Sequence, residues 1–234
     1  MEGYEMPEKV LGILETINAV IKDSHVIYPN GEHGRVYIDE DATYPHVTEI
    51  SHLCRKIAEQ FADDNIEAVI APAIGGVILS QWVAHHLAKL NNRKVLSVYA
   101  EETEKSTSPL WHICFGLRLW WKKFPQLGKA PEKFFAIKQD YEKLIIGKNI
   151  LVVGNVLATG GSTKKVIKAT QLAGGNIVGL GVFCNLSGIT SQDMANVKLV
   201  ALLEKRLSTW SKENCPRCNR GIPVAIDSNI ANRV

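Results

Sequence analysis

The hydrophobic residues of this chain follow two spacings, one typical of amphipathic helices and one typical of buried strands. Apolar side chains that recur every three or four positions predict helices over residues 8–22, 48–61, 77–90 and 163–173. Short apolar runs predict strands that are buried on both faces, at residues 67–71, 94–99, 134–138, 150–153, 176–185 and 197–203. Because strands and helices alternate, we expect an α/β fold with a doubly wound parallel sheet of about five strands.

The segment from Lys148 to Thr163 combines a strand, a glycine turn and the start of a helix. Glycines allow the backbone to approach a ligand closely, and the N-terminus of a helix attracts anions. The hydroxyl groups of Thr159, Ser162 and Thr163 add possible donors. The turn lacks the Gly-Lys-Ser/Thr ending of a Walker loop. A plain turn is the alternative, but the flanking strand and helix favour a phosphate site, formed by Ala158, Thr159, Gly160, Gly161, Ser162 and Thr163.

A second strand–turn–helix unit has glycines at the same place. The strand at residues 67–71 leads into Pro72, and the helix follows Gly76. In open α/β sheets ligands bind at the carboxyl ends of the strands, so the two turns are expected to share one site. The alternative is that this turn needs glycine only for its geometry. The candidate residues of the turn are Ala73, Ile74, Gly75 and Gly76.

The segment from Lys148 to Thr163 resembles the phosphoribosyl-pyrophosphate (PRPP) motif of type I phosphoribosyltransferases, and the wider run from Tyr141 to Asn185 is most similar to orotate phosphoribosyltransferases. The resemblance implies that residues 158–163 bind the 5′-phosphate of PRPP, while residues 73–76 bind its pyrophosphate. The positions that contact the ribose hydroxyls in the family are Gly154 and Asn155 here. The implied reaction transfers the phosphoribosyl group of PRPP to a pyrimidine base, orotate, with Mg²⁺ as cofactor and release of pyrophosphate.

The chain also departs from the family's pattern at three places. The two ribose positions carry acids in the family, but here they are Gly154 and Asn155. The pyrophosphate turn often contains a lysine, which Gly75 replaces. Leu186 stands about where the family has an arginine for the carboxylate of the base. Two alternatives therefore stay open: a catalytically degenerate PRPP- or nucleotide-binding regulatory protein, or a phosphoribosyltransferase for another base.

The resemblance also implies a small hood that covers the base. We expect one phosphoribosyltransferase-like domain over residues 1–234, in which residues 24–45 and the C-terminal tail form this hood. Two short extended pieces around Asn30-Gly31 predict a hairpin. Together with Tyr37 and Asp39, this turn partly matches the family's hood segment; a plain surface hairpin is the alternative.

Residues 101–131 are the least regular part of the pattern. A polar stretch from Glu101 to Pro109, expected to be mobile, precedes a tryptophan-rich segment at residues 110–124. So many aromatic residues in a connecting segment suggest that it contacts the site, a second subunit or a lipid surface. Among these alternatives we rank packing against a subunit or the hood first. By the resemblance, Lys105 and His112 are the catalytic candidates on a closing loop, and a homodimer is expected.

Composition narrows the classes of function. The 234 residues suffice for a sizeable core, and a net charge of +3 is too small to argue for nucleic acid as a partner. The N-terminus lacks the pattern of a signal peptide, and no apolar run reaches the length of a membrane span, so no membrane contact is expected. Cys54, Cys114 and Cys184 lie among apolar residues and are interpreted as reduced core residues. We expect a cytoplasmic protein.

The last two cysteines are Cys215 and Cys218, in the sequence Cys-Pro-Arg-Cys. Their spacing is that of half a zinc site, but a tetrahedral site needs two further ligands. A turn with two free thiols is the simpler interpretation, and a metal shared across a dimer is the alternative.

Overall fold

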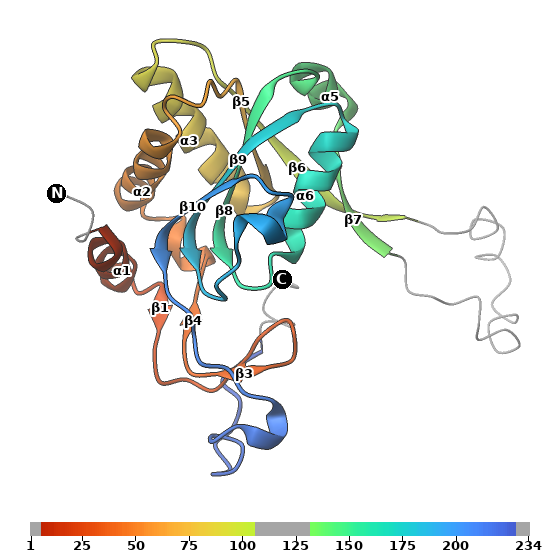
Figure 1. Cartoon of the computed structure of the whole chain (residues 1–234). Helices are drawn as coiled ribbons and strands as arrows, with labels where there is room; N and C mark the ends of the chain where they lie inside the picture. Colours follow the sequence, from red (N-terminus) through yellow and green to blue (C-terminus); the bar gives the residue numbers. More distant parts are fainter. Residues whose placement is uncertain (1–5, 106–131, 228–234) are drawn as a thin grey trace, which may run out of the picture.

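The centre of the molecule is a six-stranded sheet in the order β10–β9–β8–β5–β6–β7, called the main sheet here (Figure 1). The computed structural model describes residues 6–105 and 132–227. All neighbouring pairs of the main sheet are parallel except β6–β7. Its strands are β5 (Ala68–Pro72), β6 (Leu96–Lys105), β7 (Glu132–Ile137), β8 (Asn149–Leu157), β9 (Asn176–Asn185) and β10 (Lys198–Glu204).

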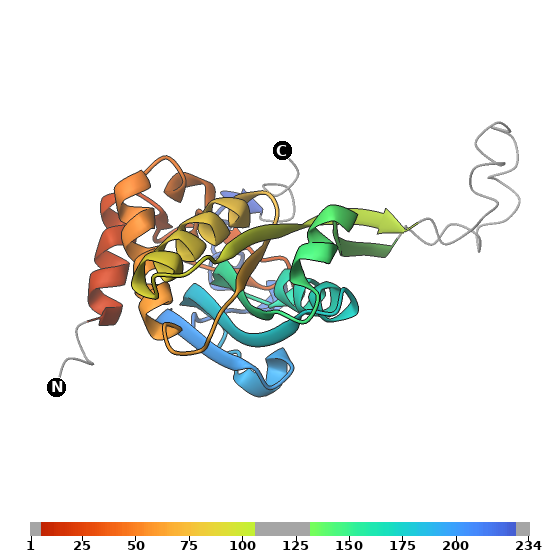
Figure 2. The same cartoon turned by 90° about the horizontal axis from the view of Figure 1, so that it is seen from above.

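Helices cover both faces of the main sheet (Figure 2). One apolar cluster joins the sheet to α1 (Met6–Thr16), α2 (Val47–Gln60) and α3 (Gly75–Leu90). A second cluster joins the opposite face to α5 (Gln139–Ile145) and α6 (Gly161–Leu172). Strands buried from both sides explain the continuous apolar runs in the sequence. The predicted doubly wound α/β fold is confirmed.

Two predicted elements have different limits in the structure. The first helix ends at Thr16 instead of continuing to residue 22, because Asn18 has a left-handed backbone with φ of 56°. Val20–Ile21 then forms the short strand β1. The polar residues 101–105, expected to be mobile, belong to β6 and pair with β7. The β6–β7 ribbon extends beyond the body of the molecule (Figure 2), so polar side chains are compatible with a strand there.

Two much smaller sheets lie beyond the carboxyl ends of β8, β9 and β10 (Figure 1). β1 pairs with β4 (Tyr37–Ile38) in an antiparallel manner. The other, called the small sheet here, has the order β11–β2–β3 and consists of β2 (Val26–Ile27), β3 (His33–Gly34) and β11 (Ile226–Asp227). β2 and β3 form the hairpin predicted around Asn30-Gly31. The small sheet therefore joins segments that are far apart in the sequence.

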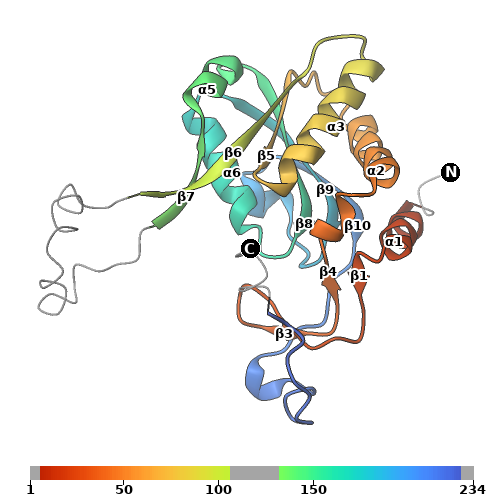
Figure 3. The ribbon, with the colours of Figure 1, turned by 180° about the vertical axis from the view of Figure 1, so that it is seen from behind.

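Short 3-10 helices complete the described part of the chain: Asp41–Thr43, Ser191–Met194 and Lys212–Asn214. The first of these connects β4 to α2 and runs beside the carboxyl end of β8 when the molecule is seen from behind (Figure 3). The tryptophan-rich segment at residues 110–124 lies outside the described residues. No helix of the described residues is long and apolar enough to cross a membrane.

Candidate functional site

The turn between β8 and α6 has the geometry that an anion site requires. Gly160 precedes the helix with φ of 70°, a left-handed conformation that glycine adopts without a steric penalty. A Cβ atom at Gly160 would lie 2.2 Å from Met194 Cε, so a side chain at this position would also require Met194 to move. Thr159, Gly161 and Ser162 are exposed. The first N–H groups of a helix have no carbonyl partner within it. In α6 the N–H of Gly161 donates to Thr159 Oγ1 at 3.4 Å, and the N–H groups that follow it can face an anion.

The turn between β5 and α3 lies next to it, because β5 and β8 are parallel neighbours in the main sheet. Ile74 in this turn is 90% exposed, and the peptide bond between Ala73 and Ile74 is cis. A Cβ atom at Gly75 would lie 1.7 Å from the hydroxyl of Tyr44. The tyrosine ring therefore packs directly against the backbone of this turn and requires glycine there.

Asn155 connects this turn to the segment after β4. Its side-chain amide donates to the Tyr44 hydroxyl, at 2.6 Å, and to Glu40 Oε2, at 3.1 Å. Its carbonyl oxygen Oδ1 is buried and has no hydrogen-bond partner among the described residues. An unsatisfied buried oxygen is costly in a folded protein, so it indicates a place for a donor from a ligand.

The electrostatics of the three side chains follow from their burial. The pKa of the Glu40 carboxyl is raised to about 7, chiefly because the group is buried. The hydrogen bond from Asn155 lowers this pKa, and the nearby carboxylates of Asp41 and Asp39 raise it. Burial also raises the pKa of Tyr44, so that its hydroxyl stays neutral. A carboxyl with a pKa near neutrality can hold or release a proton under ordinary conditions, as groups at functional sites often do.

Gly154, the other predicted ribose position, precedes Asn155 on β8. A Cβ atom there would meet only Val182 Cγ1, at an ordinary contact distance of 3.8 Å. Packing therefore does not require glycine at this position, and a side chain could be accommodated. Glu40 brings a carboxyl to the neighbouring residue Asn155 from another part of the chain.

The predicted hood residues serve local structure in the described conformation. Asn30 bonds to Glu32 across the exposed turn at Gly31, where φ is 82°. Asp39 accepts hydrogen bonds from the backbone N–H groups of Asp41 and Ala42, at the start of the short helix that follows. Tyr37 lies in β4.

The remaining predicted residues are not assembled at these two turns. Lys105 is the last residue of β6, on the projecting ribbon, and His112 lies outside the described residues. Leu186 follows β9 and packs against the first apolar cluster. Cys215 and Cys218 lie close to two histidines of the small sheet, at a separate place.

Sequence reasoning missed Glu40 and Tyr44. Both lie in or next to the acidic run Asp39-Glu40-Asp41, between β4 and α2. Three consecutive acids near a predicted ligand site were the available signal. Their contact with Asn155, which is more than 100 residues away, depends on the tertiary fold.

No family model matches the chain. The orotate phosphoribosyltransferase of Thermoanaerobacter sp. (strain X514) is 30% identical over 220 residues, which covers 93% of this chain and 94% of that protein. The enzyme of the same name from Caldanaerobacter subterraneus subsp. tengcongensis is 29% identical over 219 residues, which covers 93% and 94% of the two chains.

A similar fold occurs in the crystal structure of orotate phosphoribosyltransferase from Aeropyrum pernix. Its TM-score is 0.58 at 19% identity, and the match covers 83% of this chain and 93% of that chain. At this identity the structural likeness supports the fold. The sequence relatives match over nearly their whole length. The turn at residues 158–163, the turn at residues 73–76 and Asn155 lie at the carboxyl ends of the neighbouring strands β5 and β8. The chain belongs to the orotate phosphoribosyltransferase family.

Proposed function

We propose that this protein binds PRPP at the carboxyl ends of β5 and β8 and transfers its phosphoribosyl group to orotate, forming orotidine monophosphate and pyrophosphate. The observation that carries the proposal is the turn at residues 158–163, where a strand, a left-handed glycine and a helix start present N–H groups beside a second glycine turn. Full-length similarity to orotate phosphoribosyltransferases supports the choice of base.

In this reaction the chain's own residues position the substrates. N1 of orotate forms a bond to C1′ of PRPP and loses its proton to water. The bond between C1′ and the pyrophosphate oxygen breaks, and its electron pair leaves with pyrophosphate. Residues 158–163 would hold the 5′-phosphate, and residues 73–76 would hold pyrophosphate through backbone donors. Fixing both ends of PRPP in this way places C1′ relative to the incoming nitrogen.

The ribose would lie against Asn155 and Glu40. The unsatisfied Oδ1 of Asn155 can accept a hydrogen bond from a ribose hydroxyl. The Glu40 carboxyl and Asn155 Oδ1 are also oxygen ligands of the type that Mg²⁺ prefers, so the residues present are compatible with a Mg²⁺ ion that enters with PRPP. When bound, that ion would neutralise charge on the departing pyrophosphate.

A second candidate function is binding without turnover, as in a PRPP- or nucleotide-binding regulatory protein. The observation in its favour is the absence of an acidic side chain at Gly154 and of a lysine in the turn at Gly75, where Tyr44 occupies the space. A phosphoribosyltransferase for another base is a third possibility, because Leu186 provides no positive charge for the carboxylate of orotate.

Two measurements separate these functions. Calorimetry with PRPP and Mg²⁺ tests binding, and we expect binding at sub-millimolar concentrations. No binding at millimolar PRPP would contradict both the transferase and the regulatory function. Release of pyrophosphate, measured with orotate, uracil, adenine and hypoxanthine in turn, then decides between them. Turnover with orotate supports the first proposal, turnover only with another base supports the third, and binding without turnover supports the second.

The variant Gly154→Asp sharpens the assignment of the ribose site. The position has room for a side chain, and a carboxylate there could accept a hydrogen bond from a ribose hydroxyl. One such bond is worth about 1.4 kcal/mol, so we expect PRPP affinity to rise by about tenfold. The matched control is Gly12→Asp, in α1, where a Cβ atom meets nothing within 4 Å. Unchanged affinity in both variants would mean that Gly154 does not face the ribose.

The proposal extends to assembly and compartment. A homodimer in the cytoplasm is expected for this protein by its resemblance to the family. Light scattering at several protein concentrations tests the dimer, and fractionation of cells tests the compartment.

A further inference from the structure

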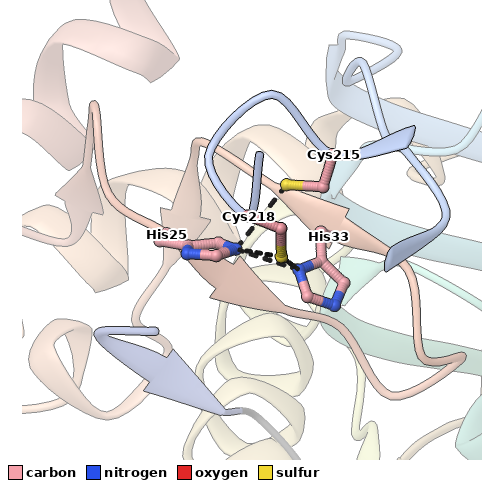
Figure 4. A group of neighbouring side chains, drawn as sticks. All are labelled: His25, His33, Cys215 and Cys218. Carbon is pink, nitrogen blue, oxygen red and sulfur yellow. Dashed lines mark hydrogen bonds between the residues drawn. The ribbon is translucent and has the colours of Figure 1, made fainter. Parts of the chain in front are cut away.

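Four side chains that can bind a metal converge at the small sheet (Figure 4). His25 lies next to β2, His33 is in β3, and Cys215 and Cys218 come from the segment between β10 and β11. Their ligand atoms all lie within 4.8 Å of one another. The first three side chains are buried, with 2%, 3% and 1% exposure respectively, so the cluster is enclosed by the protein.

The distances within the cluster agree with a tetrahedral centre. His25 Nε2 lies 3.6 Å from the sulfur atoms of both Cys215 and Cys218, and His33 Nδ1 lies 3.4 Å from Cys218 Sγ. A tetrahedral zinc ion has Zn–N bonds of about 2.0 Å and Zn–S bonds of about 2.3 Å, which places nitrogen and sulfur about 3.5 Å apart. The two ring nitrogens are closer, at 2.9 Å, and would separate by a few tenths of an ångström around an ion.

The environment of His25 orients its free ring nitrogen toward this centre. Its Nδ1 lies 2.7 Å from the carbonyl oxygen of Ile222, and a carbonyl can only accept, so Nδ1 carries the proton. Nε2 is then unprotonated and presents its lone pair to the two sulfur atoms. A backbone carbonyl bonded to the second ring nitrogen is the usual partner of a histidine that binds a metal.

The small sheet needs such a centre because it has little else to hold it. Its three strands have two residues each. Both apolar clusters of the described residues lie elsewhere, at the main sheet and its helices. Sheets this small are only marginally stable in water, and small protein units without a core are commonly held by a metal or a disulfide. The two thiols are free, which leaves the metal.

The geometry points to a mononuclear Cys₂His₂ zinc site formed by His25, His33, Cys215 and Cys218. The ion binds two thiolates and two neutral imidazoles and has no open position for a substrate, so its role is structural. It joins the C-terminal segment to the β2–β3 hairpin across 185 residues of sequence. Sequence reasoning found the cysteine pair alone, because the histidines stand in a hairpin near the other end of the described chain.

Metal analysis of the full chain, purified without a histidine tag, tests the site directly. Elemental analysis by mass spectrometry is expected to find about one zinc per chain. Replacement of zinc by Co²⁺ should give the visible absorption of a tetrahedral site with thiolate ligands. A chain that holds a different metal at these four residues would overturn the assignment of zinc, and its spectrum would identify the ion.

Variants locate the ion. Cys215→Ser and Cys218→Ser should each lower zinc content by about tenfold after dialysis against a weak chelator, because each removes a thiolate ligand. The matched controls are Cys54→Ala and His52→Ala, both in α2 and outside the cluster, which should retain zinc. Loss of zinc in the controls as well would place the metal elsewhere.

Wild-type protein provides a test that does not depend on the folding of a variant. Removal of zinc by a strong chelator under reducing conditions should accelerate hydrogen exchange about tenfold at the amides of His33 and Trp210, which bond to each other's carbonyl groups. Amides of β5 in the main sheet should not change. If the reduced protein contains no zinc and takes up neither Zn²⁺ nor Co²⁺ at micromolar concentrations, the four side chains form a hydrogen-bonded cluster only and the proposal is wrong.

Discussion

The main sheet and the small sheet are stabilised in different ways. The main sheet lies between two apolar clusters, and its central strands are buried on both faces. Beside the small sheet lie four groups that can bind a metal, of which His25, His33 and Cys215 are buried and Cys218 is partly exposed. Val26 of β2 is buried as well. Burial of apolar surface needs only hydrophobic residues of suitable size and spacing, whereas a metal centre needs particular atoms at particular distances. The hydrophobic core can therefore be recognised from the sequence pattern, whereas the metal-binding cluster can be recognised only from the three-dimensional structure.

The largest effect is expected at Glu40, which accepts a hydrogen bond from Asn155 of β8 in the main sheet. Between pH 4.5, its ordinary pKa, and pH 7, its pKa here, the folded state holds a proton that the unfolded state releases. Stability therefore falls as pH rises through this window, by up to about 3 kcal/mol. Glu40→Gln should remove this slope, as measured by urea unfolding at pH 5, 6, 7 and 8.

Glu49→Gln, in the first turn of α2, is the control for this prediction. It should shift the free energy of unfolding by a similar small amount at every pH and keep the slope. A slope that survives in Glu40→Gln would mean that another group causes it.

The next effect concerns the turn between β8 and α6. Gly160→Ala introduces a side chain at a left-handed position and within 2.2 Å of Met194 Cε. Together these should lower the free energy of unfolding by about 2 kcal/mol. Gly161→Ala, one residue later in α6, should be tolerated, because its added atom meets only Thr159 Oγ1 at 3.5 Å. Equal unfolding midpoints for the two variants would show that the turn is more adaptable than its geometry indicates.

The smallest effect on global stability is expected in the small sheet. Val26 and Val69 are both fully buried, the first in β2 and the second in β5. Val69→Ala should lower the free energy of global unfolding by about 2 kcal/mol. Val26→Ala should lower it by less than about 0.5 kcal/mol, because the small sheet can open while the main sheet stays folded.

Hydrogen exchange and urea unfolding of the two valine variants check this difference. A Val26→Ala variant that loses as much global stability as Val69→Ala would show that the two sheets unfold as one unit. The distinction between the two regions would then fail.

Sequence reasoning predicted the main sheet well because its strands and helices depend on local patterns. The continuous apolar run Ile150–Val153 is typical of a buried strand, and Val166 and Ile167 belong to the apolar face of an amphipathic helix. Both patterns can be recognised without knowledge of tertiary contacts. The end of α1 was not predicted, because it depends on the positive φ of the single residue Asn18, which the hydrophobic pattern does not reveal. Residues 101–105 were also missed, because their polar side chains are typical of loops and only the partner strand β7 makes them a strand.

The candidate site was predicted in part for the same reason. The glycine turns at residues 73–76 and 158–163 are local motifs and lie side by side as neighbouring parallel strands require. Glu40 and Tyr44 reach Asn155 from a segment more than 100 residues earlier, and His25 and His33 reach the cysteines from still farther away. Such contacts depend on the tertiary structure of the whole chain, so they cannot be predicted from local patterns in a single sequence.

The pairing of β11 with β2 has a consequence for the order of synthesis. A ribosome completes every strand of the main sheet before it makes Ile226 and Asp227, so the hairpin with His25 and His33 must wait for partners that are translated near the end of the described chain. During that interval the imidazoles of His25 and His33 have no cysteines to pair with. The nascent protein can therefore assemble the main sheet before the small sheet.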